Sequence, residues 1–167
     1  MNVSELEVVE PVGPLMLFGE GMVLRLRLRG AELTALFPCD VARFAVSARP
    51  GQPPEDDAPL RARFAPGVRL RGSLSLRAAT PDAVTPEVVP ATTALGLTVT
   101  APDALHAAHG VALVGEVLRV DEEDPEEVWV DCGLPTPVLA PWTRSPAPVL
   151  PCRARWWGDL WILPASR

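Results

Sequence analysis

Apolar and basic residues alternate without a break from Val23 to Arg29, in the order V-L-R-L-R-L-R. Successive side chains of a β-strand point to opposite faces, so the three leucines lie on one face and the three arginines on the other. A similar alternation covers residues 68–77. This period of two is typical of a half-buried strand and does not fit a helix. The sequence therefore predicts a sheet with one apolar and one arginine-rich face.

Proline makes up 20 of the 167 residues, and proline is excluded from helix interiors and from the hydrogen-bonded middle of a sheet. Many short strands and turns are expected, and the fold class is all-β, a small barrel or sandwich. One short helix is expected at residues 101–109, between Thr100 as its cap and Gly110 as its terminator. A second, shorter helix is considered at Ala31–Phe37. The expected strands are Met16–Phe18, Met22–Arg29, Val41–Ser47, Arg61–Phe64, Val68–Arg77, Leu95–Val99, Val111–Val120, Glu127–Asp131, Val138–Leu139 and Arg153–Leu163.

The two halves of the chain share a short pattern. Residues 69–76 and 153–162 both read Arg-x-Arg and then Gly-[Ser/Asp]-Leu-x-[Leu/Ile], and the glycines of the two copies are Gly72 and Gly158. The positions of strands and glycines in the C-terminal half resemble an OB-fold, a small oligonucleotide- and oligosaccharide-binding barrel. This resemblance implies two tandem OB-like barrels as the alternative to a single barrel or sandwich. The expected units are then residues 1–79 and 94–167, joined by a proline-rich linker at 80–93.

Charge is unevenly distributed along a chain whose net charge is −6. Residues 25–77 contain ten arginines against five acidic residues, whereas residues 78–167 contain five arginines against twelve. The basic middle segment leaves room for a local basic patch on an acidic protein. Lysine is absent, which excludes a P-loop nucleotide site because that motif needs a lysine.

The three cysteines, Cys39, Cys132 and Cys152, form no Cys-x-x-Cys pair, so we expect unpaired, buried thiols in a reducing compartment. The first residues lack the basic and apolar regions of a signal peptide, and no apolar run approaches the roughly 20 residues that span a bilayer. The richness in Ala, Arg, Gly and Pro is typical of a GC-rich genome. We therefore expect a bacterial protein of the cytoplasm, with no membrane partner.

The strand expected at residues 153–163 holds the most suggestive side chains. Alternation places arginines and tryptophans on one of its faces, and the arginine faces of residues 22–29 and 68–77 would extend this surface. Guanidinium and indole groups together stack bases and neutralise phosphates, and they also dominate the binding energy of protein interfaces. The predicted binding surface consists of Arg153, Arg155, Trp157, Trp161, Arg25, Arg27, Arg69 and Arg71.

Six carboxylates occur within residues 121–127. This run lacks the central glycine of a calcium loop, and it is expected to be a solvated hairpin tip. The alternative is a recognition loop for a basic partner, formed by Asp121, Glu122, Glu123 and Asp124.

His106, His109 and Asp103 would lie on one face of the expected helix, and all three are residue types that can bind a metal ion. Asp103 and His109 would lie about 9 Å apart along the helix axis, too far for one ion, so no metal site is predicted. No Gly-x-Ser-x-Gly motif or catalytic triad is recognisable, so no catalytic residue and no cofactor are predicted. The expected function is that of a non-enzymatic binding module with a protein partner. The alternatives are single-stranded nucleic-acid binding by OB-like barrels and a small metal-dependent enzyme that uses His106, His109 and an acidic residue.

Overall fold

The computed structural model describes residues 2–15, 21–39, 62–77, 86–99, 110–144 and 146–165, and the elements of this part are ten β-strands. The predicted all-β class is therefore confirmed. The helix expected at 101–109 and the strands expected at 16–18 and 41–47 lie outside the described residues. The strands are β1 (Ser4–Leu15), β2 (Gly21–Leu28), β3 (Ala31–Pro38), β4 (Arg69–Arg77), β5 (Glu87–Val88), β6 (Gly96–Val99), β7 (Val111–Val120), β8 (Glu127–Asp131), β9 (Val138–Pro141) and β10 (Arg153–Pro164).

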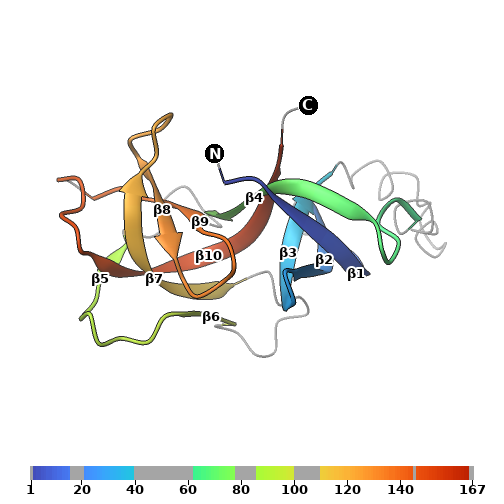
Figure 1. Cartoon of the computed structure of the whole chain (residues 1–167), viewed down its shortest axis with the longest axis horizontal. Coiled ribbons are helices and arrows are strands. Elements are labelled where there is room, and N and C mark those ends of the chain that lie inside the picture. Colours follow the sequence, from blue (N-terminus) through green and yellow to red (C-terminus); the bar gives the residue numbers. More distant parts are fainter. Residues whose placement is uncertain are drawn as a thin grey trace, which may run out of the picture.

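Eight of the strands close into a ring in the order β10-β3-β2-β1-β4-β9-β8-β7, with β7 pairing back to β10 (Figure 1). The short strands β5 and β6 add to this ring at β10 and at β7. The fold is thus a closed barrel with extra strands, which confirms the prediction of a small barrel.

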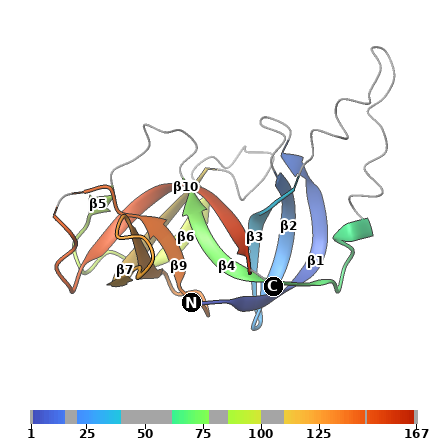
Figure 2. The same ribbon diagram turned by 90° about the horizontal axis from the view of Figure 1, so that it is seen from above.

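A further pairing crosses the middle of the ring. The C-terminal half of β10 is antiparallel to β4, from Asp159 opposite Arg77 to Pro164 opposite Gly72. This two-stranded central ribbon divides the ring into an N-terminal circuit of β1, β2, β3, β10 and β4 and a C-terminal circuit of β7, β8, β9, β4 and β10. Figure 2 shows β1, β2 and β3 on one side of the ribbon and β7 and β9 on the other.

The two circuits have the same connectivity. Each begins with three consecutive antiparallel strands, the first of which has an irregular register, and each ends with a strand that pairs back to the first. The third strand is parallel to the last strand of the other unit, β3 to β10 and β9 to β4. β4 and β10 therefore occupy equivalent positions, and each is shared by the two circuits.

The repeated sequence pattern has a structural counterpart in these shared strands. Gly72 is the last residue of β4 to pair with β1 before the strand continues along β10. Gly158 is the last residue of β10 to pair with β7 before that strand continues along β4. A Cβ atom at Gly72 would lie 2.8 Å from Cγ2 of Ile162 and closer still to the carbonyl oxygen of Leu163, so the close crossing requires glycine.

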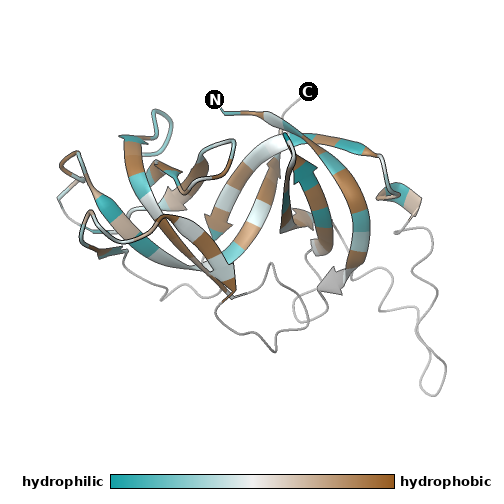
Figure 3. Cartoon of the chain, turned by 60° about the horizontal axis from the view of Figure 1, so that its bottom comes forward, coloured by the Kyte–Doolittle hydropathy of each residue, from teal (hydrophilic) through white to brown (hydrophobic). Residues whose placement is uncertain are grey.

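One continuous hydrophobic core fills both circuits, because the apolar face of each strand points inward. Figure 3 shows apolar and polar residues alternating along the strands around it. Leu24, Leu26 and Leu28 of β2 are buried, and Arg25 and Arg27 between them are exposed, as the alternation predicts. In the ribbon both faces of β4 are covered, so residues 72–76 are all buried.

The expected helix at Ala31–Phe37 is wrong, since these residues form β3. β2 and β3 are joined by a two-residue turn, in which Arg29 and Gly30 have φ angles of 47° and 86°. Positive φ at both central residues is the signature of a type I′ hairpin turn, which sets the register of the two strands. Pairing with β2 therefore decides the conformation of this short apolar stretch, against its local helical pattern.

Two other strand assignments need correction. The sequence does not predict β1, because Pro11 and Pro14 interrupt its pattern. In the structure the pairing of β1 with β2 shifts register twice, between Val8 and Glu10 and between Pro11 and Gly13, and Pro14 follows the second shift. The predicted strand at Arg61–Phe64 is wrong, because residues 62–64 form a helical turn. The proposed linker at 80–93 stays a prediction, with β5 lying within it and residues 80–85 outside the described part.

Candidate functional site

β10 runs without a register break from Arg153 to Pro164, so its alternation holds throughout. Trp156, Leu160 and Ile162 point into the core, and the indole N–H of Trp156 donates to the carbonyl oxygen of Pro141 at 2.7 Å. Arg155 and Trp157 point outward on the opposite face. The predicted division of this strand into an aliphatic face and an arginine–tryptophan face is present in the structure.

The outward face of β10 is flanked by β5 and β7. The Arg155 guanidinium lies 3.5 Å from a carboxylate oxygen of Glu87 on β5 and 5.8 Å from the ring centre of Trp157. The Trp157 side chain is 37% exposed. Arg153, at the start of the strand, pairs instead with Glu116 of β7 at 2.7 Å.

Trp161 does not share this open face, although it belongs to the predicted surface. Its ring packs against Val23 and Leu36 of the N-terminal circuit. A Cβ atom at Gly21 would lie 2.9 Å from this ring, which shows how closely it covers β2. Trp157 and Trp161 therefore do not form a pair of exposed stacking platforms.

The arginine faces of β2 and β4 are exposed, but the neighbouring strands pair most of their charges. Arg25 lies 3.1 Å from Glu10, and Arg69 lies 2.6 Å from Glu5. Arg27 lies between two carboxylates, those of Glu7 and Glu32, on β1 and β3. These side chains form an alternating charge ladder across the sheet. Arg71 is exposed, and in the described part of the chain it has no ion pair.

The acidic residues after β7 form an ordered hairpin tip. Asp121 accepts hydrogen bonds from the indole N–H of Trp129 at 2.8 Å and from the backbone N–H groups of Glu123 and Asp124. Burial acts to raise the pKa of Asp121, but these hydrogen bonds outweigh it and lower that pKa. Glu122 is 91% exposed, beside Arg119 at 3.9 Å. The loop lines a cavity of about 280 Å³ between β8, β9 and the end of β10.

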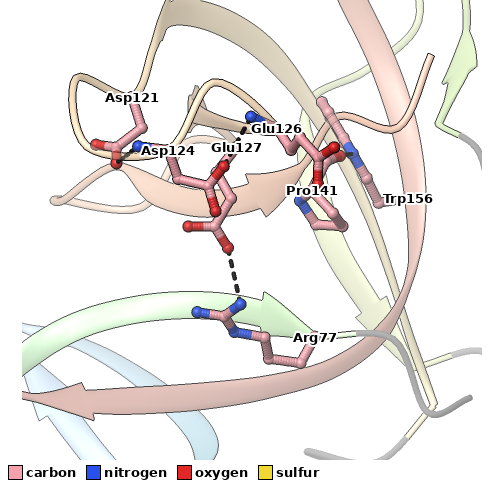
Figure 4. A network of polar contacts seen from close by, with 7 residues as sticks. All are labelled: Arg77, Asp121, Asp124, Glu126, Glu127, Pro141 and Trp156. Atoms are coloured by element: carbon pink, nitrogen blue, oxygen red, sulfur yellow. Dashed lines mark hydrogen bonds and ion pairs between the residues drawn. The ribbon is translucent and has the colours of Figure 1, made fainter. Parts of the chain in front are cut away.

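Beside this tip, Glu127 of β8 reaches across to Arg77 at the end of β4, with an N–O distance of 2.7 Å (Figure 4). Burial raises the pKa of the Glu127 carboxyl above its ordinary value, although the Arg77 charge opposes this. The ion pair thus links β4 of the central ribbon to β8. Among the described residues, no group of three acidic, histidine or cysteine side chains is arranged to hold a metal ion, and His106 and His109 lie outside them.

The structure shows a second cavity, of about 400 Å³, that the sequence did not reveal. It lies between β5, the start of β10 and the proline-rich residues 146–151. Val149 and Val88, which line it, are 82% and 52% exposed, and Leu150, next to Val149 in the chain, is 50% exposed. The pattern P-A-P-V-L-P, with two large apolar residues between prolines, was the available sequence signal. The lining residues are Val88, Val89, Ala91, Glu116, Trp142, Arg144, Pro146, Ala147, Pro148, Val149, Pro151, Cys152 and Arg153.

No disulfide bond joins the three cysteines, and of the three only Cys132 is buried as predicted, while Cys39 and Cys152 are partly exposed. Burial raises the pKa of Cys132 and of Cys152, so neither is activated as a nucleophile.

Comparisons with protein-family models, with curated proteins and with solved structures find no match to this chain. Within the described residues, no helix has the length and apolar character needed to cross a membrane.

Proposed function

We propose that this chain is a non-enzymatic protein-binding module. The proposed binding surface, here called the β10 surface, consists of Arg155, Trp157, Val88, Val149 and Leu150. The observation that supports it most is the exposure of large apolar side chains, of which Val88 and Val149 line one cavity at the start of β10. On β5, Glu87 lies opposite Arg155 on the outward face of β10, whereas Val88 lies opposite Ala154 and lines the cavity that Val149 also lines. Exposed apolar groups clustered beside an arginine and an indole are typical of protein-interaction sites.

The charge distribution favours a protein partner over nucleic acid. Phosphate binding needs arginines whose charge is available, because affinity comes from the counterions they release. Arg25, Arg27, Arg69 and Arg155 each lie beside a carboxylate of a neighbouring strand. An alternating charge ladder presents no extended basic track to a phosphate backbone.

The strand order of the two circuits supports the OB-like reading of the fold. Three antiparallel strands, a third strand parallel to a fifth, and a fourth strand closing onto the first make a five-stranded Greek-key barrel of the OB type. In this proposal the units exchange their last strands, so that β10 and β4 each take the fifth position of the other unit. Such barrels bind single strands across their second and third strands and the adjoining loops. In the C-terminal circuit that region lies beside the acidic tip of Asp121–Asp124, which would repel phosphate. Cytoplasmic location and bacterial source remain predictions from composition.

The test is affinity purification from an extract of the producing organism, with quantitative mass spectrometry. The wild-type chain is compared with the double variant Trp157→Ser/Val149→Ser. Leu118→Ser is the matched control, because Leu118 is also a large exposed apolar residue, at 45%, but lies on β7 and outside the β10 surface. We expect at least one partner that the double variant loses and the control retains. If the double variant retains every partner, or if oligo-dT binds the wild type at low salt with an affinity that falls steeply with added salt, the proposal is wrong.

A further inference from the structure

The 400 Å³ cavity beside β10 has the size of a ligand pocket, which typically ranges from about 300 to 1,000 Å³. Its walls are mainly apolar, formed by Val88, Val149 and the prolines of residues 146–151. Trp142 is buried at the cavity, and its indole N–H already donates to the carbonyl oxygen of Pro146 at 3.3 Å. The cavity is therefore mainly apolar, and the indole N–H of Trp142 already has a hydrogen-bond partner within the protein.

Two of the three charged residues at this cavity neutralise one another. Arg153 donates to a carboxylate oxygen of Glu116 at 2.7 Å and to the carbonyl oxygen of Thr93 at 2.6 Å. The Arg153 side chain is only 19% exposed, and its Nε atom is buried with no hydrogen-bond partner in the part of the chain that the structure describes. This pair fixes the start of β10 against β7 and leaves little charge for a ligand.

Arg144 is different. It is exposed, and among the described residues its side chain has one hydrogen bond, from Nη1 to the carbonyl oxygen of Pro86 at 3.4 Å. No carboxylate within the described residues pairs with it. A guanidinium has five N–H donors, so most of those of Arg144 are open to a ligand. The cavity thus combines an apolar interior with one available positive charge at its rim.

We propose that this cavity is the anchor pocket of the protein-binding surface, and that it takes an apolar side chain of the partner next to a carboxylate that pairs with Arg144. This inference rests on the proposed function. Charge complementarity selects the acidic group, since the remaining charges of the pocket cancel. The apolar walls select an aliphatic or aromatic side chain, because burying it removes apolar surface from water on both sides. A guanidinium binds a carboxylate with two parallel hydrogen bonds, which would fix the orientation of the segment.

The inference is tested with N-acetyl-L-leucine, which places a carboxylate beside an aliphatic side chain, and with N-acetyl-L-leucinamide, which has the same side chain without the charge. Both are titrated into 15N-labelled full-length protein. The readout is the shift of the Trp142 indole N–H resonance together with backbone resonances around the pocket. We expect shifts confined to the pocket, and an affinity about fivefold higher for the carboxylate than for the amide, as an ion pair near the surface provides.

Two variants separate the parts of the pocket. Arg144→Gln is expected to abolish the preference for the carboxylate and to keep the weak binding of the amide. Ala91→Trp, which fills the cavity from its rim, is expected to lose both ligands. Arg63→Gln is the control, because Arg63 is also an exposed arginine but packs over the Phe64 ring and does not line the pocket. It is expected to bind both ligands like the wild type.

Absence of shifts at the pocket, equal affinity for the two compounds, or an unchanged preference in Arg144→Gln would each overturn the inference. A concentration-dependent dimer that Ala91→Trp abolishes would overturn it as well, since a second copy would then occupy the cavity. The proposed function is judged separately. If a partner is lost by the Trp157→Ser/Val149→Ser protein but binds Arg144→Gln and Ala91→Trp normally, the β10 surface stands and the pocket assignment falls.

Discussion

Two serines on one face of β4 should respond to the same substitution in opposite directions. Ser73 donates a hydrogen bond from its hydroxyl to the carbonyl oxygen of Asn2 at 2.9 Å. Ser75, two residues further along the central ribbon, is fully buried, and its hydroxyl oxygen has no hydrogen-bond partner among the described residues. The substitutions Ser73→Ala and Ser75→Ala remove the same atom from the same strand face, so they differ mainly in this hydrogen bond.

The expected magnitudes follow from the state of each hydroxyl. A buried hydroxyl without a partner costs about 1–3 kcal/mol, and removing it leaves only a small void, so Ser75→Ala should raise the free energy of unfolding by about 1 kcal/mol. Ser73→Ala loses a satisfied hydrogen bond and should lower that free energy by about 1 kcal/mol. The variants should then differ by about 2 kcal/mol, and in a domain of this size their melting temperatures should differ by roughly 4–8 °C.

The assay is urea unfolding followed by tryptophan fluorescence, with thermal unfolding by circular dichroism as a second measurement. Equal dependence of the free energy on urea concentration in all three proteins shows that the variants unfold from the same native structure. If Ser75→Ala destabilises the protein as much as Ser73→Ala does, then the Ser75 hydroxyl is satisfied and the reasoning about the ribbon is refuted.

Three further predictions concern the C-terminal circuit. Gly115→Ala should destabilise by about 1–3 kcal/mol in urea unfolding, because the new Cβ would lie 2.9 Å from the carbonyl oxygen of Asp131, whereas Gly96→Ala meets no atom within 4 Å and should be nearly neutral. Asp121→Asn should destabilise more at pH 7 than below pH 3.8, because a pKa lowered by folding adds stability that is lost as the pH falls through it; equal effects at both pH values would contradict this. Burial raises the pKa of Glu127, so its contribution to stability falls as the pH rises above 4.5, and Glu127→Gln should compare more favourably with the wild type at pH 7 than at pH 4; the opposite trend in urea unfolding would show that its ion pair dominates.

The strands that could be predicted are those whose pattern is complete within a few residues. β7 and β8 have the bounds that the sequence suggested, β4 and β10 differ by one residue at one end, and β2 is shifted by one residue at both ends. Alternation suffices there because one face of each strand is buried and the other is exposed. β1 and β3 escaped prediction because prolines interrupt the first and the second depends on a hairpin partner.

The candidate site was predictable only in part. Alternation along β10 placed Arg155 and Trp157 on an outward face, and the structure has them there. The packing of Trp161 on β2 and β3 could not be foreseen, because it depends on a parallel contact between residues far apart in the chain. The pairing of the arginines with carboxylates has the same origin, since Arg69 and Glu5 meet only when β4 lies beside β1.

The sequence by itself determined that the chain folds as β-strands, which face of each regular strand is apolar, and that Gly72 and Gly158 are equivalent positions. These properties depend on side-chain period and on local repetition, which are written into neighbouring residues. Only the tertiary structure decided that the two circuits share β4 and β10, and that a cavity opens beside the proline-rich residues 146–151. Both depend on which strand edges meet across the fold. Strands pair through backbone N–H and C=O groups, which are the same in nearly every residue, so the local sequence does not reveal which distant edges pair.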